Sequence, residues 1–501
     1  MTKKAKVVVV GAGIGGLTAG ALLARYGYDV VVYEQATVPG GCASSFKRKG
    51  FVFDVGATQV AGLEEEGIHY RIFRELEVEL PEATECEPAC AVFLPGEKTP
   101  IMVWRNPEKW KRERQMQFPN SEPFWRLIEV LFKASWEFQS RDPILPPRTL
   151  WDLTQLLKAF RLDTLYTVPF TLMTVADALF LLGLAGDKRL KTFLDLQLKL
   201  YSQVDASQTA LLYGATALSL PQYPQGLYHL KGSMQVLSDR LQEGLEKHGG
   251  KLCLRHRVKK IHSDGKRATG VTVQNLKTGE VHRQHADYVI ANVTVNNLVT
   301  MTENLPPSYC RRVENLPPAS GAFVVYLGVK QEAIPNNCPL HLQFLYEEGE
   351  IAEVNSLFVS VSQPGDGRAP QGKATITASS FTNVDKWWNL SPLDYNALKQ
   401  DYTHKAISRL AEYFNLTEDT IILQESATPV TFYRYTGREK GIVGGVGQRV
   451  TTFGPFAIPN RTPLKNLWLV GDSTHPGEGT AGVSYSALTA VRQLLHASHN
   501  I

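Results

Sequence analysis

The stretch KVVVVGAGIGGLTAGALLARYGYDVVVYE, residues 6–34, decides the fold of the N-terminal part of the chain. Its opening run, residues 6–10, is rich in valine, which is typical of a strand buried on both faces of a parallel sheet. A glycine-rich turn follows, and then a helical pattern to about Arg25. Residues 29–33 have the pattern of a second strand. The stretch therefore predicts a strand–helix–strand unit.

Three glycines of the turn have the spacing G-x-G-x-x-G: Gly11, Gly13 and Gly16. The first permits a tight turn, the second lets the backbone approach a pyrophosphate, and the third lets the helix pack on the strand. The helix N-terminus then offers N–H groups to phosphate. Glu34 ends the second strand, 18 residues after Gly16, where a carboxylate can accept hydrogen bonds from ribose hydroxyls. The pattern predicts a dinucleotide site.

Composition sets limits on the class of protein. A chain of 501 residues is too long for one compact core, so two or three domains are expected. The chain has 53 basic and 49 acidic residues, a net charge of +4, which is too small to indicate a nucleic-acid partner.

The N-terminus superficially resembles a secretory signal, because lysines precede an apolar run at residues 7–23. Glycines at motif spacing favour the dinucleotide site instead, since a signal does not need them. The six cysteines form no disulfide framework, so the reducing cytoplasm is expected. Cys86 and Cys90 lie four apart without a nearby histidine, and no metal site is predicted.

Further elements can be placed along the rest of the chain. A helix is expected at about 234–245, a strand at 252–261, a hairpin pairing 270–274 with 281–283, and a short strand at 288–291. The β-rich runs 321–330, 357–361 and 374–378 predict an antiparallel sheet in a second domain. Residues 364–372 are the best candidate for a surface loop. A strand at 467–470 precedes a helix from about Gly482.

Two motifs carry a resemblance to a known family. The string from residue 7 to the glycine pair Gly40–Gly41, and GDSTHPGEGTAGVSYSALTA at 471–490, resemble the FAD motifs of the amine-oxidase-like flavoprotein superfamily. The resemblance implies that Gly471 and Asp472 bind the ribityl or pyrophosphate part of FAD. It also implies that the helix at Gly482 and Val483 points its N-terminus at the flavin, and that backbone near Val258 pairs with adenine.

PGGCASSF at 39–46 and GFVFDVGATQVAGL at 50–63 resemble the carotenoid branch of that superfamily, and most closely a cyanobacterial-type C-3',4' desaturase. The resemblance implies FAD-dependent desaturation of a C–C bond in an apolar carotenoid, with quinone or oxygen as electron acceptor. A carotenoid cis-trans isomerase using reduced FAD is the alternative. An amine oxidase would need an aromatic cage, for which Tyr433 and Tyr435 are too little. A flavin-free Rab GDP-dissociation inhibitor is disfavoured by the intact cofactor motifs.

Few catalytic side chains are expected, because a polyene has no acidic proton and no charged group. His475 and Glu478 are candidates for charge stabilisation or proton handling, with structural support of their glycine-rich loop as the alternative. Cys42 stands where many relatives have an arginine that neutralises phosphate, and residues 47–49 (Lys-Arg-Lys) are candidate substitutes. Arg438 and the two charged residues after it are expected in a solvated loop, with a place in the lining of the flavin pocket as the alternative.

The predicted fold class is α/β with an α+β second domain. A Rossmann-like FAD-binding domain comprises residues 1–70, 230–300 and 441–501, a mixed-sheet substrate domain 71–120 and 301–440, and a helical, membrane-contacting subdomain 121–229. Residues 165–186 carry one charge, Asp177, in 22 residues. That length suits a membrane span, but Pro169 and Asp177 oppose one. Basic flanks favour a peripheral, monotopic contact at the cytoplasmic surface, and a buried helix is the alternative.

Overall fold

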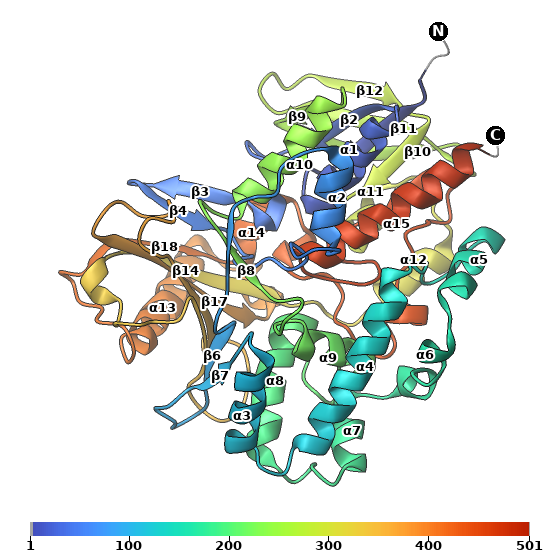
Figure 1. The fold of residues 1–501 in the computed structure, drawn as a ribbon. Coiled ribbons are helices and arrows are strands. Elements are labelled where there is room, and N and C mark those ends of the chain that lie inside the picture. The colour runs from blue at the N-terminus through green and yellow to red at the C-terminus, as the bar shows by residue number, and fades with distance from the viewer. Residues whose placement is uncertain (1–3, 500–501) are drawn as a thin grey trace.

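The computed structural model describes residues 4–499 and divides the chain between two main sheets and a helical region (Figure 1). The first sheet is parallel, in the order β19 (Leu467–Leu469), β13 (Tyr288–Ala291), β1 (Lys6–Val10), β2 (Asp29–Glu34) and β9 (Lys251–Leu254). Its central strand, β1, contains the valine run, so the predicted Rossmann-like sheet is confirmed.

The valines of β1 explain why the run has no polar alternation. Val7 and Val9 pack into a core with four helices, whereas Val8 and Val10 pack into a core on the opposite face. The helices are α1 (Ile14–Arg25), α2 (Ile68–Leu76), α10 (Gln235–Lys247) and α15 (Thr480–His499). The opposite face is covered by the antiparallel strands β10 (His256–Ser263), β11 (Ala268–Asn275) and β12 (Val281–His285). A strand covered on both faces must be apolar on both.

One predicted strand is wrong in its extent. The run 252–261 does not form a single strand, because Arg255 has a left-handed backbone with φ of 59°. The kink separates β9, in the parallel sheet, from β10, which pairs with β11. The predicted hairpin is confirmed by the antiparallel pairing of β11 and β12. The kink also places Val258 on β10, a strand that packs against the parallel sheet without pairing with it.

The second sheet has the order β18-β14-β17-β16-β15-β6-β7. All its pairs are antiparallel except β15 with β6, so the sheet is mixed, as predicted. Its strands are β18 (Ile421–Ala427), β14 (Gly321–Lys330), β17 (Lys373–Thr382), β16 (Ser356–Val361), β15 (His341–Leu345), β6 (Cys90–Phe93) and β7 (Ile101–Val103). The helix α13 (Pro392–Leu410) packs on it through Tyr402, Ala406 and Leu410.

Shorter elements join these layers. The strands β3 (Ser45–Arg48) and β4 (Phe51–Asp54) form a hairpin. The strands β5 (Ala83–Glu85) and β8 (Tyr228–Leu230), which are far apart in the sequence, form a second antiparallel pair. Three further helices are α11 (Val295–Met301), α12 (Pro307–Glu314) and α14 (Pro429–Thr436). Residues of β4 face the mixed sheet, where Phe51 and Phe53 pack with Tyr326. The N-terminal segment therefore runs from the parallel sheet to the mixed sheet.

The helical region lies at the lower right of Figure 1. It contains α3 (Pro107–Gln117), α4 (Glu122–Ser140), α5 (Leu150–Ala159), α6 (Leu162–Leu165), the 3₁₀ helix η2 (Val168–Leu172), α7 (Val175–Leu181), α8 (Lys188–Ser202) and α9 (Leu211–Ser219). The apolar stretch 165–186 is divided among several short elements. Thr174 and Asp177 form a capping box that starts α7, so the one charge of the stretch begins a new helix. Across residues 4–499, no helix is long and apolar enough to cross a membrane.

Candidate cofactor and substrate site

One large cavity joins the three layers, and its volume is about 1530 Å³. Small-molecule sites usually have about 300–1,000 Å³, so this cavity has room for a dinucleotide and a second, extended ligand. The residues predicted to bind the cofactor line it with one exception: Gly11, Gly13, Glu34, Gly40, Gly41, Val258, Gly471, Asp472, Gly482 and Val483. The exception, Gly16, lies behind the turn, where a Cβ atom would be 2.0 Å from the carbonyl oxygen of Gly11.

The glycine turn leaves no room for side chains. Gly11 has φ of 91°, and a Cβ there would meet the carbonyl oxygen of Asn292 at 2.7 Å. A Cβ at Gly13 would lie 2.7 Å from the side-chain nitrogen of Asn292. Gly13 is also the N-cap of α1, and no side chain caps that helix. The first N–H groups of α1 are therefore available to an anion, as a phosphate site requires.

Glu34 lies on the same cavity wall and is 8% exposed. Its Oε2 accepts a hydrogen bond from the backbone N–H of Ala12 at 2.8 Å, and its Oε1 accepts one from Ala36 at 2.8 Å. Burial raises the pKa of Glu34, while these backbone N–H groups work to lower it. Each carboxylate oxygen can accept a further hydrogen bond, which is what a pair of ribose hydroxyls needs.

The C-terminal loop contributes a buried ion pair. Arg438 Nη2 lies 2.7 Å from Asp472 Oδ2, and both side chains are about one-sixth exposed or less, at 16% and 14%. Arg438 therefore does not lie in a solvated loop but lines the cavity, as the alternative expectation held. Its guanidinium also lowers the pKa of the neighbouring Cys42 thiol against the larger effect of burial, which raises it. The side chains at 47–49 are exposed on the β3–β4 hairpin and do not line the cavity, so the cation near Cys42 is Arg438.

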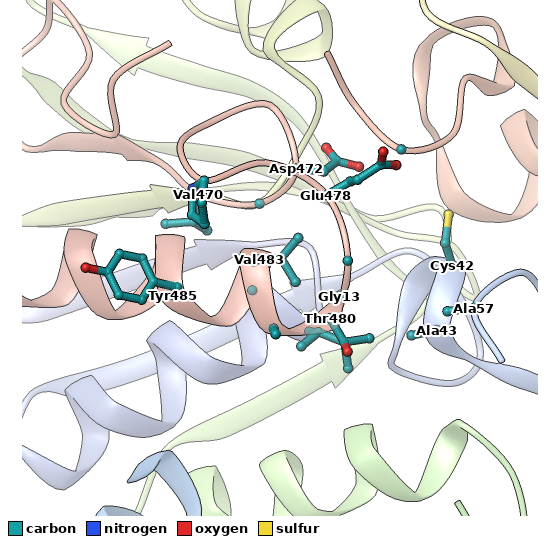
Figure 2. Close-up of a pocket in the computed structure, with 18 of the residues that line it drawn as sticks. Gly13, Cys42, Ala43, Ala57, Val470, Asp472, Glu478, Thr480, Val483 and Tyr485 are labelled. Carbon is teal, nitrogen blue, oxygen red and sulfur yellow. The ribbon is translucent and has the colours of Figure 1, made fainter. Parts of the chain in front are cut away.

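Glu478 is a second acid on this loop. Figure 2 shows its carboxyl group near that of Asp472, above the first turn of α15, with Cys42 and Ala57 on the N-terminal segment that faces them. Its Oε2 accepts a hydrogen bond from Gln203 Nε2 at 2.7 Å. Burial raises the pKa of Glu478 well above its ordinary value. Burial therefore favours the neutral carboxylic acid, a form that can donate a proton or a hydrogen bond into the cavity.

Glu478 and Gln203 pack so tightly against Gly444 that no side chain could be accommodated there. A Cβ at Gly444 would lie 2.2 Å from Glu478 Oε2 and 2.0 Å from Gln203 Nε2. The second carboxyl oxygen of Glu478 is buried, and no described residue forms a hydrogen bond with it. A buried polar atom without a partner is costly, so this oxygen is suited to a group on a bound molecule.

His475 is another buried side chain of this loop with polar atoms that have no hydrogen-bond partner among the described residues. Its ring is 6% exposed, and neither ring nitrogen has a hydrogen-bond partner within the described part of the chain. Burial lowers the pKa of His475 to about 4, so the imidazole is neutral at physiological pH. Its ring centre lies 5.5 Å from that of Phe453, and both residues line the cavity. The structure thus brings His475 and Glu478 to one wall, with nitrogen and oxygen atoms available to a ligand.

Away from these groups, the cavity wall becomes apolar. The helical region and the mixed sheet supply this part of the wall, which we call the apolar limb: Leu156, Phe160, Val168, Leu200, Tyr201, Leu212, Tyr213, Ala217, Leu220, Phe358 and Phe381. An aromatic cage for an amine does not form from the two tyrosines near the motif. Tyr435 is 61% exposed and absent from the lining, and Tyr433 is 48% exposed.

Comparison with known proteins agrees with this geometry. A family model described as flavin containing amine oxidoreductase matches residues 14–495. The chain belongs to this family. The prolycopene isomerase of Daucus carota is 26% identical over 97% of this chain and 79% of its own length. The zeta-carotene-forming phytoene desaturase of Myxococcus xanthus is 26% identical over 99% and 95%. The solved structure of putrescine oxidase bound to putrescine has a TM-score of 0.65 at 15% identity, covering 99% of each chain.

These findings make the protein an FAD-dependent oxidoreductase, and the resemblance to the carotenoid branch is confirmed. The cavity fits the cofactor on its own evidence. The turn at Gly11 and Gly13 excludes side chains, Glu34 has free acceptor positions, and the loop before α15 carries unpartnered polar atoms. No cluster of three potential metal ligands occurs in the described chain.

Sequence reasoning missed Asn292 and Gln203, and it placed Arg438 in the pocket only as an alternative. Asn292 directly follows β13, and a polar residue at the carboxyl end of a parallel strand is a recognisable signal in this kind of sheet. Gln203 has no such signal, because it reaches Glu478 only through the packing of α8. Arg438 stands in a charged run whose local pattern resembles a solvated loop, and only the fold shows its pairing with Asp472.

Proposed function

We propose that the protein desaturates a C–C bond of a carotenoid in an FAD-dependent reaction, at the C-3',4' position. The observation that supports this proposal most strongly is one continuous cavity that extends from the glycine turn to the apolar limb. A linear polyene is a suitable occupant of that limb, since it offers apolar surface and no charge. The relatives named as an isomerase of prolycopene and a desaturase of phytoene support a carotenoid substrate.

The residues of the chain have distinct tasks in this proposal. The glycine turn holds the pyrophosphate, Glu34 holds the ribose, and the backbone near Val258 pairs with adenine. The loop at Asp472 holds the ribityl or pyrophosphate part of the cofactor. Bound FAD supplies a two-electron acceptor. The apolar limb places the polyene against it and excludes water. The N-terminus of α15, at Gly482 and Val483, favours negative charge at the nearest part of the cofactor.

A cis-trans isomerase using reduced FAD is the second candidate, and Glu478 is the observation that favours it. A neutral acid in an apolar cavity can protonate or polarise a conjugated chain without net oxidation. In the desaturase proposal, the same group stabilises charge through its unpartnered oxygen. The unpartnered nitrogens of His475 can do so too, or can support the loop.

The deciding experiment is expression of the chain in cells that make one defined carotenoid, followed by absorption spectra and mass spectra of the pigments. A desaturase lengthens conjugation, shifts absorption to the red and lowers the product mass by two hydrogen atoms. An unchanged product mass with altered cis-trans composition supports the isomerase and overturns the desaturase proposal. Unchanged pigments, with flavin bound, count against both.

We also propose that the protein binds the cytoplasmic membrane surface without spanning it. Large apolar side chains are exposed on the segment 150–182, which we call the apolar patch: Leu150, Leu153, Leu157, Leu162, Leu165, Tyr166, Val168, Leu172, Phe180, Leu181 and Leu182. Exposed patches of this kind mark interaction sites. Leu156, Phe160 and Val168 of the same segment line the cavity, so a carotenoid can enter from the lipid beneath the patch.

Charges near the patch are consistent with an anionic lipid surface. Lys158 and Arg161 are exposed beside it, whereas Arg189 is held by Glu97 at 2.7 Å. The basic stretch 104–114 contributes less than its sequence indicates, because Trp110 and Arg114 are buried. The electron acceptor is proposed to be a quinone from the same membrane, with oxygen as the alternative.

The division into domains is a proposal as well. Segments 1–70, 230–300 and 441–501 form the cofactor domain, and segments 71–120 and 301–440 form the substrate domain. The helical subdomain 121–229 carries the patch. Limited proteolysis with and without FAD tests this division, since bound cofactor ties the three segments of the first domain together.

A further inference from the structure

A chain of buried polar side chains leads from the cavity wall to the segment 364–372. The sequence predicts a surface loop there, yet two charged residues of the segment are buried. Arg368 is 3% exposed and Asp366 is 8% exposed. Charged groups are rarely buried unless they are paired. The segment has neither helix nor strand and is largely exposed, as expected of a surface loop, but these two charged side chains are buried beneath it.

Arg368 fixes the outer end of this chain. Its Nη2 donates to Asp54 Oδ2 at 3.0 Å, and its Nη1 donates to the carbonyl oxygen of Leu230 at 2.6 Å. Arg368 Nη1 also lies 2.9 Å from His229 Nε2. Asp366 Oδ2 lies 3.1 Å from the same nitrogen. His229 Nε2 thus faces a donor and an acceptor, so it can take up or release a proton at this end.

The inner end reaches the cavity at Thr58, which is 6% exposed and lines the cavity. Ser360 Oγ donates to Thr58 Oγ1 at 2.7 Å, and His341 Nδ1 lies 2.9 Å from Ser360 Oγ. Because the Ser360 hydroxyl gives its single hydrogen to Thr58, His341 Nδ1 must carry a hydrogen and donate it to Ser360. The hydroxyl hydrogen of Thr58 is then free to point into the cavity.

Two imidazole rings connect the ends, and the ring centres of His229 and His341 are 5.9 Å apart. His341 Nε2 and His229 Nδ1 are buried, and neither has a hydrogen-bond partner among residues 4–499. With the hydrogen on Nδ1, His341 Nε2 presents a lone pair. Burial, together with His229 and Arg368, holds the pKa of His341 well below its ordinary value, which keeps the ring neutral.

We infer that Asp366, His229, His341, Ser360 and Thr58 form a proton relay between the outer loop and the cavity. A small rotation of either ring, or one bridging water molecule, joins the two unpartnered nitrogens. This inference rests on the proposed function only in that the reaction transfers a hydride equivalent and a proton.

The cofactor site alone does not account for the proton that dehydrogenation releases, and the relay provides a path for that proton. Dehydrogenation of a C–C bond removes a hydride equivalent, which the cofactor accepts, and a proton, which has to leave the apolar cavity. Reduction of a quinone consumes one proton with each hydride equivalent. Burial raises the pKa of Glu478 well above its ordinary value and so favours its protonated form. The relay gives the proton a path that does not depend on Glu478.

In the described arrangement the relay delivers a proton to the cavity. Thr58 gives up its hydroxyl hydrogen, Ser360 replaces it, and His341 Nδ1 replaces that of Ser360. His341 Nε2 then takes the hydrogen of His229 Nδ1, and His229 Nε2 gains a hydrogen that comes from solvent through Asp366. Every hydrogen bond along the chain from Thr58 to Asp366 is then reversed, which is the orientation that carries the proton of the next dehydrogenation outward.

The first test reads the tautomer directly. Nitrogen-15 NMR of the FAD-loaded protein with labelled histidine should show His341 protonated on Nδ1 and unprotonated on Nε2. Ser360→Ala should move the Nδ1 resonance while flavin content stays unchanged. Protonation of His341 on Nε2 would overturn the relay. This readout needs no turnover, so it stands apart from the carotenoid proposal.

The second test measures proton delivery. The cofactor is photoreduced in the holoenzyme, and menadione, a soluble quinone, reoxidises it in H₂O and D₂O. Thr58→Val keeps the shape but removes the hydroxyl, and should slow reoxidation about tenfold or more. Thr58→Ser should retain the rate, as should Thr377→Val, which removes a hydroxyl from β17 outside the relay. An unchanged rate and isotope effect in Thr58→Val would overturn the inference, even where carotenoid turnover is found.

Discussion

The two ends of the cavity are built in different ways. At the dinucleotide end, backbone groups and short buried contacts set the geometry, as at Gly13 and Glu34. In the apolar limb, side chains of α5, η2 and α9 form a wall that is mainly apolar. A hydrogen bond is lost when one of its atoms is displaced, whereas the free energy gained from apolar contacts falls in proportion to the buried area that is lost. The first end should therefore be intolerant of substitution and the second tolerant.

The largest expected effect is that of Gly13→Val. Its Cβ would lie 2.7 Å from the side-chain nitrogen of Asn292 and would occupy the position that a pyrophosphate needs. Flavin absorbance in the purified protein should fall below detection, which corresponds to a loss of about 3 kcal/mol or more in FAD binding. Gly186→Val is the matched control, because a Cβ at Gly186 meets open space. Normal flavin content in Gly13→Val would refute the assigned site.

A smaller but still large effect is expected of Arg438→Met, which leaves the Asp472 carboxylate buried beside the cofactor without its partner. Breaking a buried ion pair costs about 3–5 kcal/mol. The Tm and the FAD affinity should both fall. Asp472→Asn in the same chain removes the uncompensated charge and should restore much of the Tm. If the single and double variants have equal Tm, the pair is not coupled.

The difference between local contacts and tertiary contacts explains which residues of the site could be predicted from the sequence. The glycine turn and Glu34 lie within one strand–helix–strand unit, so their spacing alone indicates the site. Arg438 and Gln203 come to the site through tertiary packing, and nothing in their local sequence indicates a partner. The structure of the segment 165–186 could not be predicted from its sequence for a different reason. Its hydropathy suits one long element, yet Thr174 and Asp177 cap a new helix and divide it.

Glu478→Gln should change the pH dependence of stability more than stability itself. Burial raises the pKa of Glu478, so the folded state binds a proton more tightly than the unfolded state. That stabilisation is fully present below the unfolded pKa and is lost as pH rises through the folded pKa. The Tm of the native protein should therefore fall relative to that of Glu478→Gln as pH rises above about 4.3, the ordinary pKa of a glutamic acid side chain. Parallel Tm curves from pH 5 to about 10 would contradict a protonated Glu478.

The smallest effect on the fold is expected at the apolar patch. Leu162 and Leu172 are 86% and 66% exposed, so replacing both with serine should change the free energy of unfolding by only about 0.5 kcal/mol or less. Binding to anionic lipid vesicles should weaken about tenfold or more, because two inserted leucines are lost. Leu393→Ser is the control, since Leu393 is 79% exposed on α13, outside the patch. Vesicle cosedimentation measures the difference, and equal binding by the double variant and the control would exclude the patch as the membrane contact.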